Sequence, residues 1–157
     1  MKFADRAKAM VNQLTNPESL LGLYTAFLAF DDFVATHSTP TTQTDAVSAL
    51  IAPGEPGSDY ESDAAKLTGI AHKIIDNLIN EAGTHIEDPE YSDLKADVER
   101  ICIEMTRAGG KELHNIASLA GGMVSQEIIK ILTAQYVPID NCCLFDGVAS
   151  RSSVLRI

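Results

Sequence analysis

Several residue types are scarce in this chain of 157 residues, and each scarcity narrows what the protein can be. There are 12 lysines and arginines against 22 aspartates and glutamates, which gives a net charge of −10. An acidic chain repels phosphate backbones, so we expect no nucleic-acid partner. No apolar run approaches the roughly 20 residues that span a bilayer, so we expect no membrane partner. The first residues lack the apolar centre of a signal peptide, which predicts an intracellular protein of the cytoplasm, the nucleus or both.

Cysteine and histidine are also few. Cys102, Cys142 and Cys143 form neither a CxxC pair nor a metal-binding spacing. An odd cysteine count without a secretion signal predicts reduced thiols, and free cysteines are usually buried, so we expect all three to pack as small apolar side chains. A zinc site needs three or four converging ligands. The histidines are too scattered to supply them: His37, His72, His85 and His114.

The spacing of apolar residues predicts a predominantly helical protein that ends in two strands, an α+β fold. Apolar residues make up 45% of the chain, which suffices for the core of one domain or of a piece of a larger one. Asn16-Pro17 and Asp88-Pro89 each combine a capping residue with a proline suited to a first helical turn. The expected helices cover residues 2–14, 17–37, 45–51, 61–81, 89–108 and 113–134, and the expected strands cover 141–148 and 152–157.

Each long helix has an apolar face that should enter the core. The faces follow from residues that recur three or four positions apart. The residues expected to face inward are Phe3, Ala7, Met10, Val11 and Leu14 in the first helix, Leu20, Leu21, Tyr24, Phe27, Leu28 and Phe30 in the second, Leu67, Ile70, Ile74, Leu78 and Ile79 after residue 60, and Leu94, Val98, Ile101 and Met105 in the helix before Gly109.

Two glycine pairs call for different explanations. Gly109-Gly110-Lys111 matches neither phosphate-binding glycine motif and follows a helix instead of a strand, so we expect a helix C-cap there and no nucleotide. Gly121-Gly122 lies inside an expected helix, where each glycine costs roughly 1 kcal/mol relative to alanine. Such a pair suits a helix that must pack closely, here against the strands. Gly122→Leu should then overpack the contact at a cost of about 1–3 kcal/mol.

Residues 113–147 resemble the last helix and strands of the adenylation fold in ubiquitin-like modifier activating enzymes, the ThiF family. In that family a glycine pair, a Gln-Glu and a Lys recur at this spacing before an aromatic-rich strand ending in Phe-Asp-Gly. Within the family, the regulatory, non-thioester subunits of the neddylation pathway also resemble the upstream part. The upstream matches are Leu23-Tyr24, Ala29-Phe30-Asp31-Asp32-Phe33, Pro40 and the run Lys111–Ala117.

The resemblance implies a C-terminal fragment of such a regulatory subunit. Residues 1–110 would be a helical insertion region, and residues 111–157 the last helix and β-hairpin of an incomplete, ThiF/MoeB-like, Rossmann-type pseudo-adenylation domain. The full enzyme would be a heterodimer with a catalytic subunit that adenylates a ubiquitin-like modifier with ATP and magnesium and carries it as a thioester. This chain would hold no catalytic, cofactor-binding or metal-binding residue, and alone it would neither bind ATP nor form a thioester. Structural or subunit-interface residues would be Gly121, Gly122, Gln126, Glu127 and Lys130.

Two other interpretations remain open at this point. Phe145-Asp146-Gly147 is closer to the corresponding subunit of the sumoylation pathway, although the long acidic helical segment before Leu113 argues against that branch. A free-standing helical adaptor that binds proteins would need no enzyme context. The mass of the natural protein separates the adaptor from the regulatory subunit.

The two expected strands lack a larger sheet to join. Two strands alone are marginal in water, and uncovered edges and apolar residues promote association. We therefore expect the chain to self-associate through its C-terminal region, and deletion of residues 138–157 to make it more monomeric. The apolar residues concerned are Leu144, Val148, Val154, Leu155 and Ile157.

Overall fold

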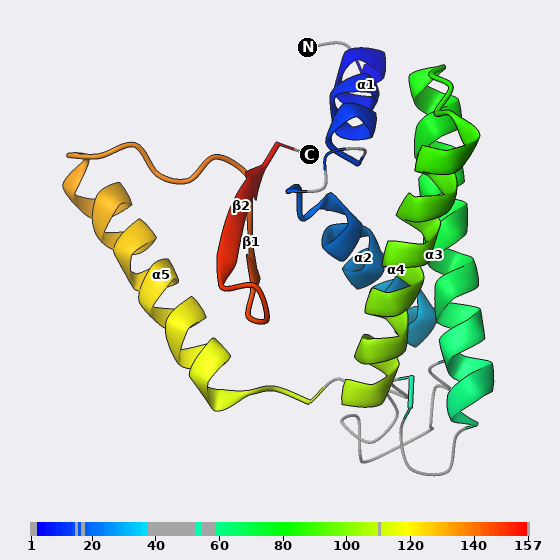
Figure 1. The fold of residues 1–157 in the computed structure, drawn as a ribbon. Coiled ribbons are helices and arrows are strands. Elements are labelled where there is room, and N and C mark those ends of the chain that lie inside the picture. The colour runs from blue at the N-terminus through cyan, green and yellow to red at the C-terminus, as the bar shows by residue number, and fades with distance from the viewer. Residues whose placement is uncertain are drawn as a thin grey trace. The chain divides into compact units, whose positions relative to one another are not determined.

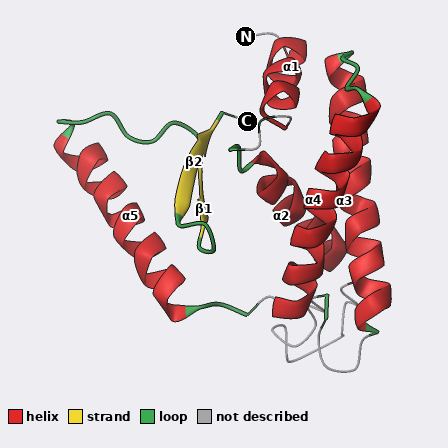
Figure 2. Ribbon diagram, in the orientation of Figure 1, coloured by secondary structure: helices red, strands yellow, loops and turns green. Residues whose placement is uncertain are grey.

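The computed structural model describes residues 3–14, 16, 18–37, 53–54, 59–109 and 111–156. They form helices and one antiparallel pair of strands, which confirms the α+β prediction (Figure 2). Among these residues, no helix combines the length and apolar character that crossing a membrane requires. The chain divides into two compact units, residues 1–110 and residues 111–157, and each is described by itself.

Among the described residues, five long helices and two strands overlap the predicted ranges (Figure 1). The predicted short helix at 45–51 lies outside the described residues. The elements are α1 Phe3–Leu14, α2 Leu21–His37, α3 Tyr60–Ala82, α4 Asp88–Ala108, α5 His114–Thr133, β1 Cys142–Asp146 and β2 Arg151–Leu155.

The first unit is built around the pair α3 and α4, which run in opposite directions on either side of the short loop 83–87 (Figure 1). Helix α2 packs against both of them, and α1 packs mainly against α3. Gly83 ends α3 and Gly109 ends α4, each with a positive φ that favours glycine. The predicted C-cap at Gly109 is therefore confirmed, since its N–H binds the carbonyls of Met105 and Thr106.

The predicted beginning of α2 at residue 17 is wrong. Oδ1 of Asn16 accepts the N–H of Glu18 at 3.0 Å, and the Asn16 carbonyl accepts the N–H of Ser19 at 2.9 Å. Ser19 Oγ then accepts the N–H of Leu21 at 3.2 Å. These local bonds satisfy the backbone in a turn, so the helix begins only at Leu21. Similarly, Asp88 opens α4 as its first residue instead of capping it, and the N-cap is Glu87.

Several of the residues predicted to face the core of the first unit are exposed or only partly buried. In α2, Phe27 and Leu28 were expected inside but are 47% and 38% exposed. Ala29 and Phe33 are buried instead, so a different side of α2 from the predicted one faces α3 and α4. In α3, Leu67 is buried as predicted, whereas the predicted Ile70, Ile74, Leu78 and Ile79 are only partly buried and Ala64, Ala71 and Ile75 take the innermost places.

A short segment at Pro53–Gly54 is anchored against the ends of α3 and α4. Pro53 is buried, and the N–H of Gly54 donates to Oδ2 of the buried Asp63 at 3.3 Å. A Cβ on Gly54 would lie only 2.0 Å from the Thr106 carbonyl oxygen. Only glycine fits this approach, and its φ of +79° also lies in the region that favours glycine.

The second unit consists of α5 and the hairpin β1–β2. The strands pair from Cys142 with Leu155 to Asp146 with Arg151. Asp146 Oδ1 accepts the N–H groups of Val148 and Ala149 at 2.9 and 3.2 Å, which fixes the turn between the strands. Each strand is shorter than predicted because this turn takes residues 147–150.

Candidate functional site

The residues singled out from the sequence lie on α5, and Glu127 connects this helix to the chain that follows it. One carboxylate oxygen of Glu127 accepts a hydrogen bond from Nζ of Lys130 at 2.6 Å. The other accepts the backbone N–H of Ile139 at 2.7 Å. Glu127 and Lys130 thus form an i,i+3 ion pair, and the same carboxylate also holds the segment that leads into β1.

The hydrogen bond from Lys130 and the one from the Ile139 N–H hold the pKa of Glu127 below its ordinary value of 4.5. Both bonds favour the charged form, and they outweigh the small opposing effect of burial. Glu127 is therefore an ionised clamp at neutral pH. Its chemistry is that of an acceptor fixed by two donors, which suits a structural role better than proton transfer.

The glycine pair does not pack against this chain's own hairpin. Gly121 and Gly122 are exposed, and among the described residues nothing lies within 4 Å of a Cβ built at either position. The expected close contact is therefore not seen here. The contact between α5 and the hairpin lies elsewhere: a Cβ on Gly147 would meet Ile116 Cδ1 at 2.8 Å. Gln126 is also exposed.

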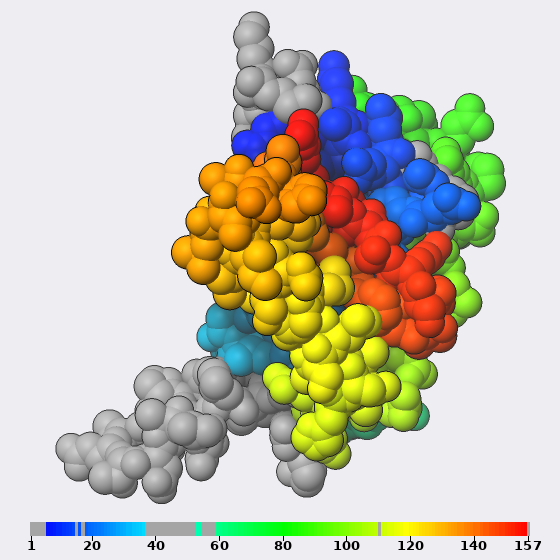
Figure 3. Space-filling model, turned by 90° about the vertical axis from the view of Figure 1, so that its left-hand side faces the viewer, coloured from blue at the N-terminus to red at the C-terminus, as the bar shows by residue number. Residues whose placement is uncertain are grey.

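Helix α5 presents apolar side chains to solvent on more than one side. None of its described residues is buried, and side chains of α5, in yellow, form part of the surface in Figure 3. Such a helix needs a cover, since large exposed apolar patches mark interaction surfaces. The large exposed apolar residues of α5 are Leu119, Val124, Ile128, Ile129, Ile131 and Leu132.

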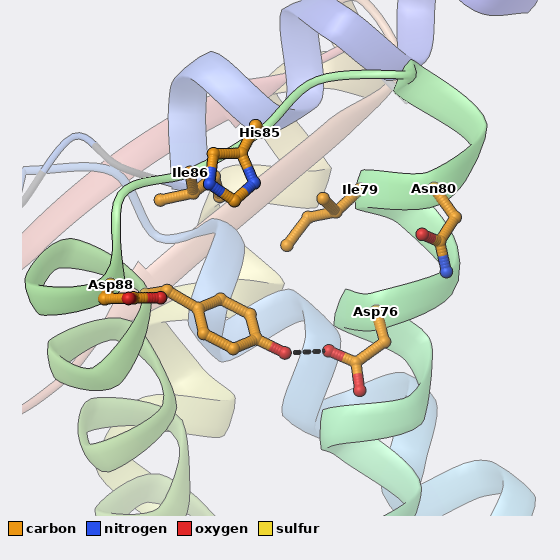
Figure 4. Close-up of a pocket in the computed structure, with 7 residues that line it drawn as sticks. Asp76, Ile79, Asn80, His85, Ile86 and Asp88 are labelled. Atoms are coloured by element: carbon orange, nitrogen blue, oxygen red, sulfur yellow. Dashed lines mark hydrogen bonds between the residues drawn. The ribbon is translucent and has the colours of Figure 1, made fainter.

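A different cluster of polar groups ties α3 to α4 in the first unit (Figure 4). The Tyr91 hydroxyl donates to Oδ1 of Asp76, and Nζ of Lys95 lies 3.1 Å from the same oxygen. Lys95 Nζ also lies 4.4 Å from the centre of the Tyr91 ring, a cation–π contact. Asp76 and Tyr91 border a cavity of about 330 Å³ that His85 and Asp88 also line.

The electrostatics of this cluster indicate a structural tie. Burial raises the pKa of Asp76, but the bonds from Tyr91 and Lys95 outweigh it, so the net pKa lies below 3.8. Burial lowers the pKa of Lys95, yet the bonds with Tyr91 and Asp76 leave it above 10.5. Both groups stay charged and mutually satisfied, and neither is poised to exchange a proton near neutral pH. The sequence does not predict this cluster. Within the sequence, its members Tyr91 and Lys95 are recognisable only by their i,i+4 spacing on one helix.

The cysteines differ from one another. Cys102 is fully buried, as predicted, and burial raises its pKa to about 11, which keeps the thiol protonated. Cys142 and Cys143 are only partly buried, so the prediction of burial is wrong for them. All five residues of β1 are partly buried, so both faces of this strand stay partly open.

Gly109 and the histidines are the remaining residues that the sequence raises as possible ligand-binding groups. Gly109 caps a helix C-terminus, whereas phosphates are held at N-termini. Within the described ranges, no three His, Cys, Asp or Glu side chains converge so that they could hold a metal ion. His72 instead lies with Nε2 3.3 Å from the Lys95 carbonyl oxygen, and His85 and His114 are exposed. The side chain of His37 lies outside the described part.

The sequence of this chain is similar to those of known proteins from several species. No protein-family model matches the chain. A Caenorhabditis elegans protein named NEDD8-activating enzyme E1 regulatory subunit is 38% identical over 105 residues, which are 66% of this chain and 18% of that protein. The Drosophila melanogaster protein of the same name is 35% identical over 62% of this chain and 16% of its own length. In Arabidopsis thaliana, the NEDD8-activating enzyme E1 regulatory subunit AXL is 28% identical over 90% of this chain and 23% of that protein.

These similarities first define a class, since the relatives are all subunits of an E1 activating enzyme. Within that class, the chain belongs to the family of NEDD8-activating enzyme E1 regulatory subunits, which confirms the resemblance seen in the sequence. It spans between 16% and 23% of the length of the three relatives described above.

Proposed function

We propose that this chain is the C-terminal part of the regulatory subunit of a NEDD8-activating enzyme. In that role it supports ATP-dependent adenylation of the modifier and thioester transfer by a catalytic partner subunit. The main support is the similarity over most of the chain to regulatory subunits from an animal and a plant. ATP and magnesium would bind to parts of the enzyme other than the residues described here.

The exposed surface of α5 gives this proposal a physical basis. Helix α5 exposes Ile128, Ile131 and Leu132 to water. Apolar surface of this kind is usually covered by a neighbouring element or by another protein. We infer that α5 and the β1–β2 hairpin are the last elements of a ThiF-like adenylation fold, whose sheet would cover these side chains. Residues 1–110 would then be a helical insertion. Gly121 and Gly122 would allow close approach of a neighbour outside the chain, either that sheet or the catalytic subunit.

Within such an assembly, the residues of this chain would hold structural elements in place. The catalytic partner subunit would carry out the thioester transfer. Glu127 would keep residue 139, and with it β1, at a fixed distance from the helix by its bonds to Lys130 and Ile139. A preorganised helix–hairpin unit lowers the entropy lost on docking. The cell compartment, cytoplasm or nucleus, follows from the enzyme's role and is part of the proposal.

A complementation experiment tests this function. The C. elegans regulatory subunit is truncated to remove the region matched by this chain, and the chain is added in trans together with the catalytic subunit, ATP, magnesium and NEDD8. We expect recovery of the NEDD8 thioester on the catalytic subunit, seen as a gel shift. The matched control is Leu132→Asp, which should fold equally well, because Leu132 is 78% exposed, yet fail to restore the thioester.

The alternatives predict different outcomes of the same assay. Recovery with a sumoylation modifier and its catalytic subunit, but not with NEDD8, would assign the chain to that pathway instead. No recovery in either system, with a correctly folded chain, would favour a free-standing adaptor and contradict the proposal.

A further inference from the structure

A second groove runs between α3 and α4 in the first unit and reaches the Asp76 cluster at its His72 end. Its volume is about 470 Å³. The lining combines small residues, of which Ala65 and Gly69 are exposed, with two partly exposed larger side chains, Tyr60 and Ile103, and with two carboxylates. The lining residues are Tyr60, Glu61, Ala64, Ala65, Thr68, Gly69, His72, Glu99 and Ile103.

Two hydrogen bonds between the helices hold the groove open at fixed width. The Tyr60 hydroxyl donates to the Ile103 carbonyl at 3.1 Å near one end. His72 Nε2 lies 3.3 Å from the Lys95 carbonyl near the other. At about 1.5 Å of rise per residue, these ties are about 18 Å apart along α3 and about 12 Å apart along α4. The groove therefore matches two to three turns of a third helix and is already formed before anything binds.

Gly69 lines the groove and lies inside α3, where no contact among the described residues accounts for a glycine. A glycine inside a helix costs about 1 kcal/mol relative to alanine. Close packing is the usual compensation, yet nothing lies within 4 Å of a Cβ built at Gly69. Gly69 is exposed, so the backbone of α3 is open to a neighbour at this point of the groove.

The charges around the groove favour a basic occupant. Glu61 and Glu99 are exposed, and the lining includes no lysine or arginine. Three neighbouring basic side chains are paired, Lys66 with Asp63, Arg100 with Asp97 and Arg107 with Glu104, and the exposed Lys73 follows the lining residue His72. The net charge of −10 adds long-range attraction for cations.

We propose that this groove binds an amphipathic helix of a partner protein, one with an aliphatic stripe flanked by lysine or arginine. The stripe would lie along the groove between the Tyr60–Ile103 bond and the His72–Lys95 bond, and it would pass over Gly69. The flanking cations would meet Glu61 and Glu99. This mode uses apolar side chains three or four positions apart as anchors. The inference rests on the first unit and is independent of the proposed role of α5.

The test uses the whole 157-residue chain and a labelled synthetic peptide. The peptide has about 18 residues, with leucines at helical spacing and lysines on either side, and a matched peptide carries glutamates in place of the lysines. Fluorescence anisotropy should show the lysine peptide binding at least about tenfold more tightly, with the advantage shrinking as salt screens the charges.

Gly69→Leu fills the groove without a clash, so it should weaken the lysine peptide by at least about tenfold while the unfolding midpoint stays the same or rises. The matched control is Gly122→Leu, also a glycine in open space inside a helix, which should leave binding within about twofold.

Glu99→Lys provides a second variant and should reduce the preference for the lysine peptide. Unchanged binding to Gly69→Leu, or equal binding of both peptides, would overturn the proposal. So would loss of self-association in Gly69→Leu without peptide binding, which would make a second copy the occupant.

Discussion

At the scale of single residues, Glu127 offers a direct measurement of how α5 holds the chain that follows it. Its folded-state pKa lies below 4.5, chiefly because of the bond from Lys130 and then of the bond from the Ile139 N–H. The contribution of this carboxylate to stability is thus complete above the ordinary pKa and is lost as the pH falls through the lower folded-state value. We expect the Ile139 amide resonance to titrate with a pKa below 4.5 in an NMR pH series.

Lys130→Met provides the control for that titration. It removes the larger cause of the shift and keeps the bond to Ile139, so the pKa should rise toward 4.5 while the amide still titrates. An Ile139 amide that does not respond to pH in the unmodified chain would show that the clamp does not form in solution.

Gly122 gives a second prediction, opposite in sign to the one that the sequence alone suggests. Because nothing lies within 4 Å of a Cβ there, Gly122→Ala should stabilise α5 in this chain by up to about 1 kcal/mol through helix propensity. In hydrogen exchange, this gain corresponds to about fivefold slower opening of α5 amides. Faster exchange in the variant would mean that the glycine does meet a close neighbour in this chain.

At the scale of elements, the Pro53–Gly54 segment is held by the ends of α3 and α4. Gly54→Ala combines a strained φ, which costs about 1–3 kcal/mol for residues other than glycine, with a Cβ only 2.0 Å from the Thr106 carbonyl. Gly83→Ala is the matched control, since Gly83 also has a positive φ but has open space around it. Chemical denaturation should show a clearly larger loss for Gly54→Ala. Equal losses would indicate that the segment is not anchored at Thr106.

The elements also show how far the sequence alone could lead. The Gly109 cap and the long helices were predictable because caps and apolar periods are local properties. The beginning of α2 was not, because the turns made by Asn16 and Ser19 compete with helix over only a few residues. The Asp76–Tyr91 bond and the Glu127–Ile139 bond depend on which side chains face each other across elements. Local sequence patterns do not specify which side chains of different elements face each other.

At the scale of the whole molecule, the exposed apolar side chains of the second unit should make the chain associate with itself. The predicted set needs revision, because Val148 and Val154 are exposed whereas Leu155 is buried and Leu144 partly so; Ile157 lies outside the described part. More of the exposed apolar surface comes from α5 than from the hairpin. Deleting residues 138–157 therefore removes too little, since Ile131 and Leu132 remain.

Deletion of residues 111–157 should instead give a monomer, since the first unit has its own core.

The intact chain should associate more strongly as salt increases. An association held by ion pairs would weaken with salt, so the salt dependence distinguishes apolar contacts from charge pairing. Each copy carries a net charge of −10, so two copies repel one another until ions screen them. The screening length falls from about 10 Å at about 0.1 M salt to about 3 Å at about 1 M. Burial of apolar side chains is not weakened by screening, so the weight-average mass from light scattering should rise between these two conditions. Leu132→Glu should reduce that rise without loss of helix content, because Leu132 is exposed. A mass that stays at one copy in both conditions, or that falls with salt, would show that the apolar surface of α5 does not drive association.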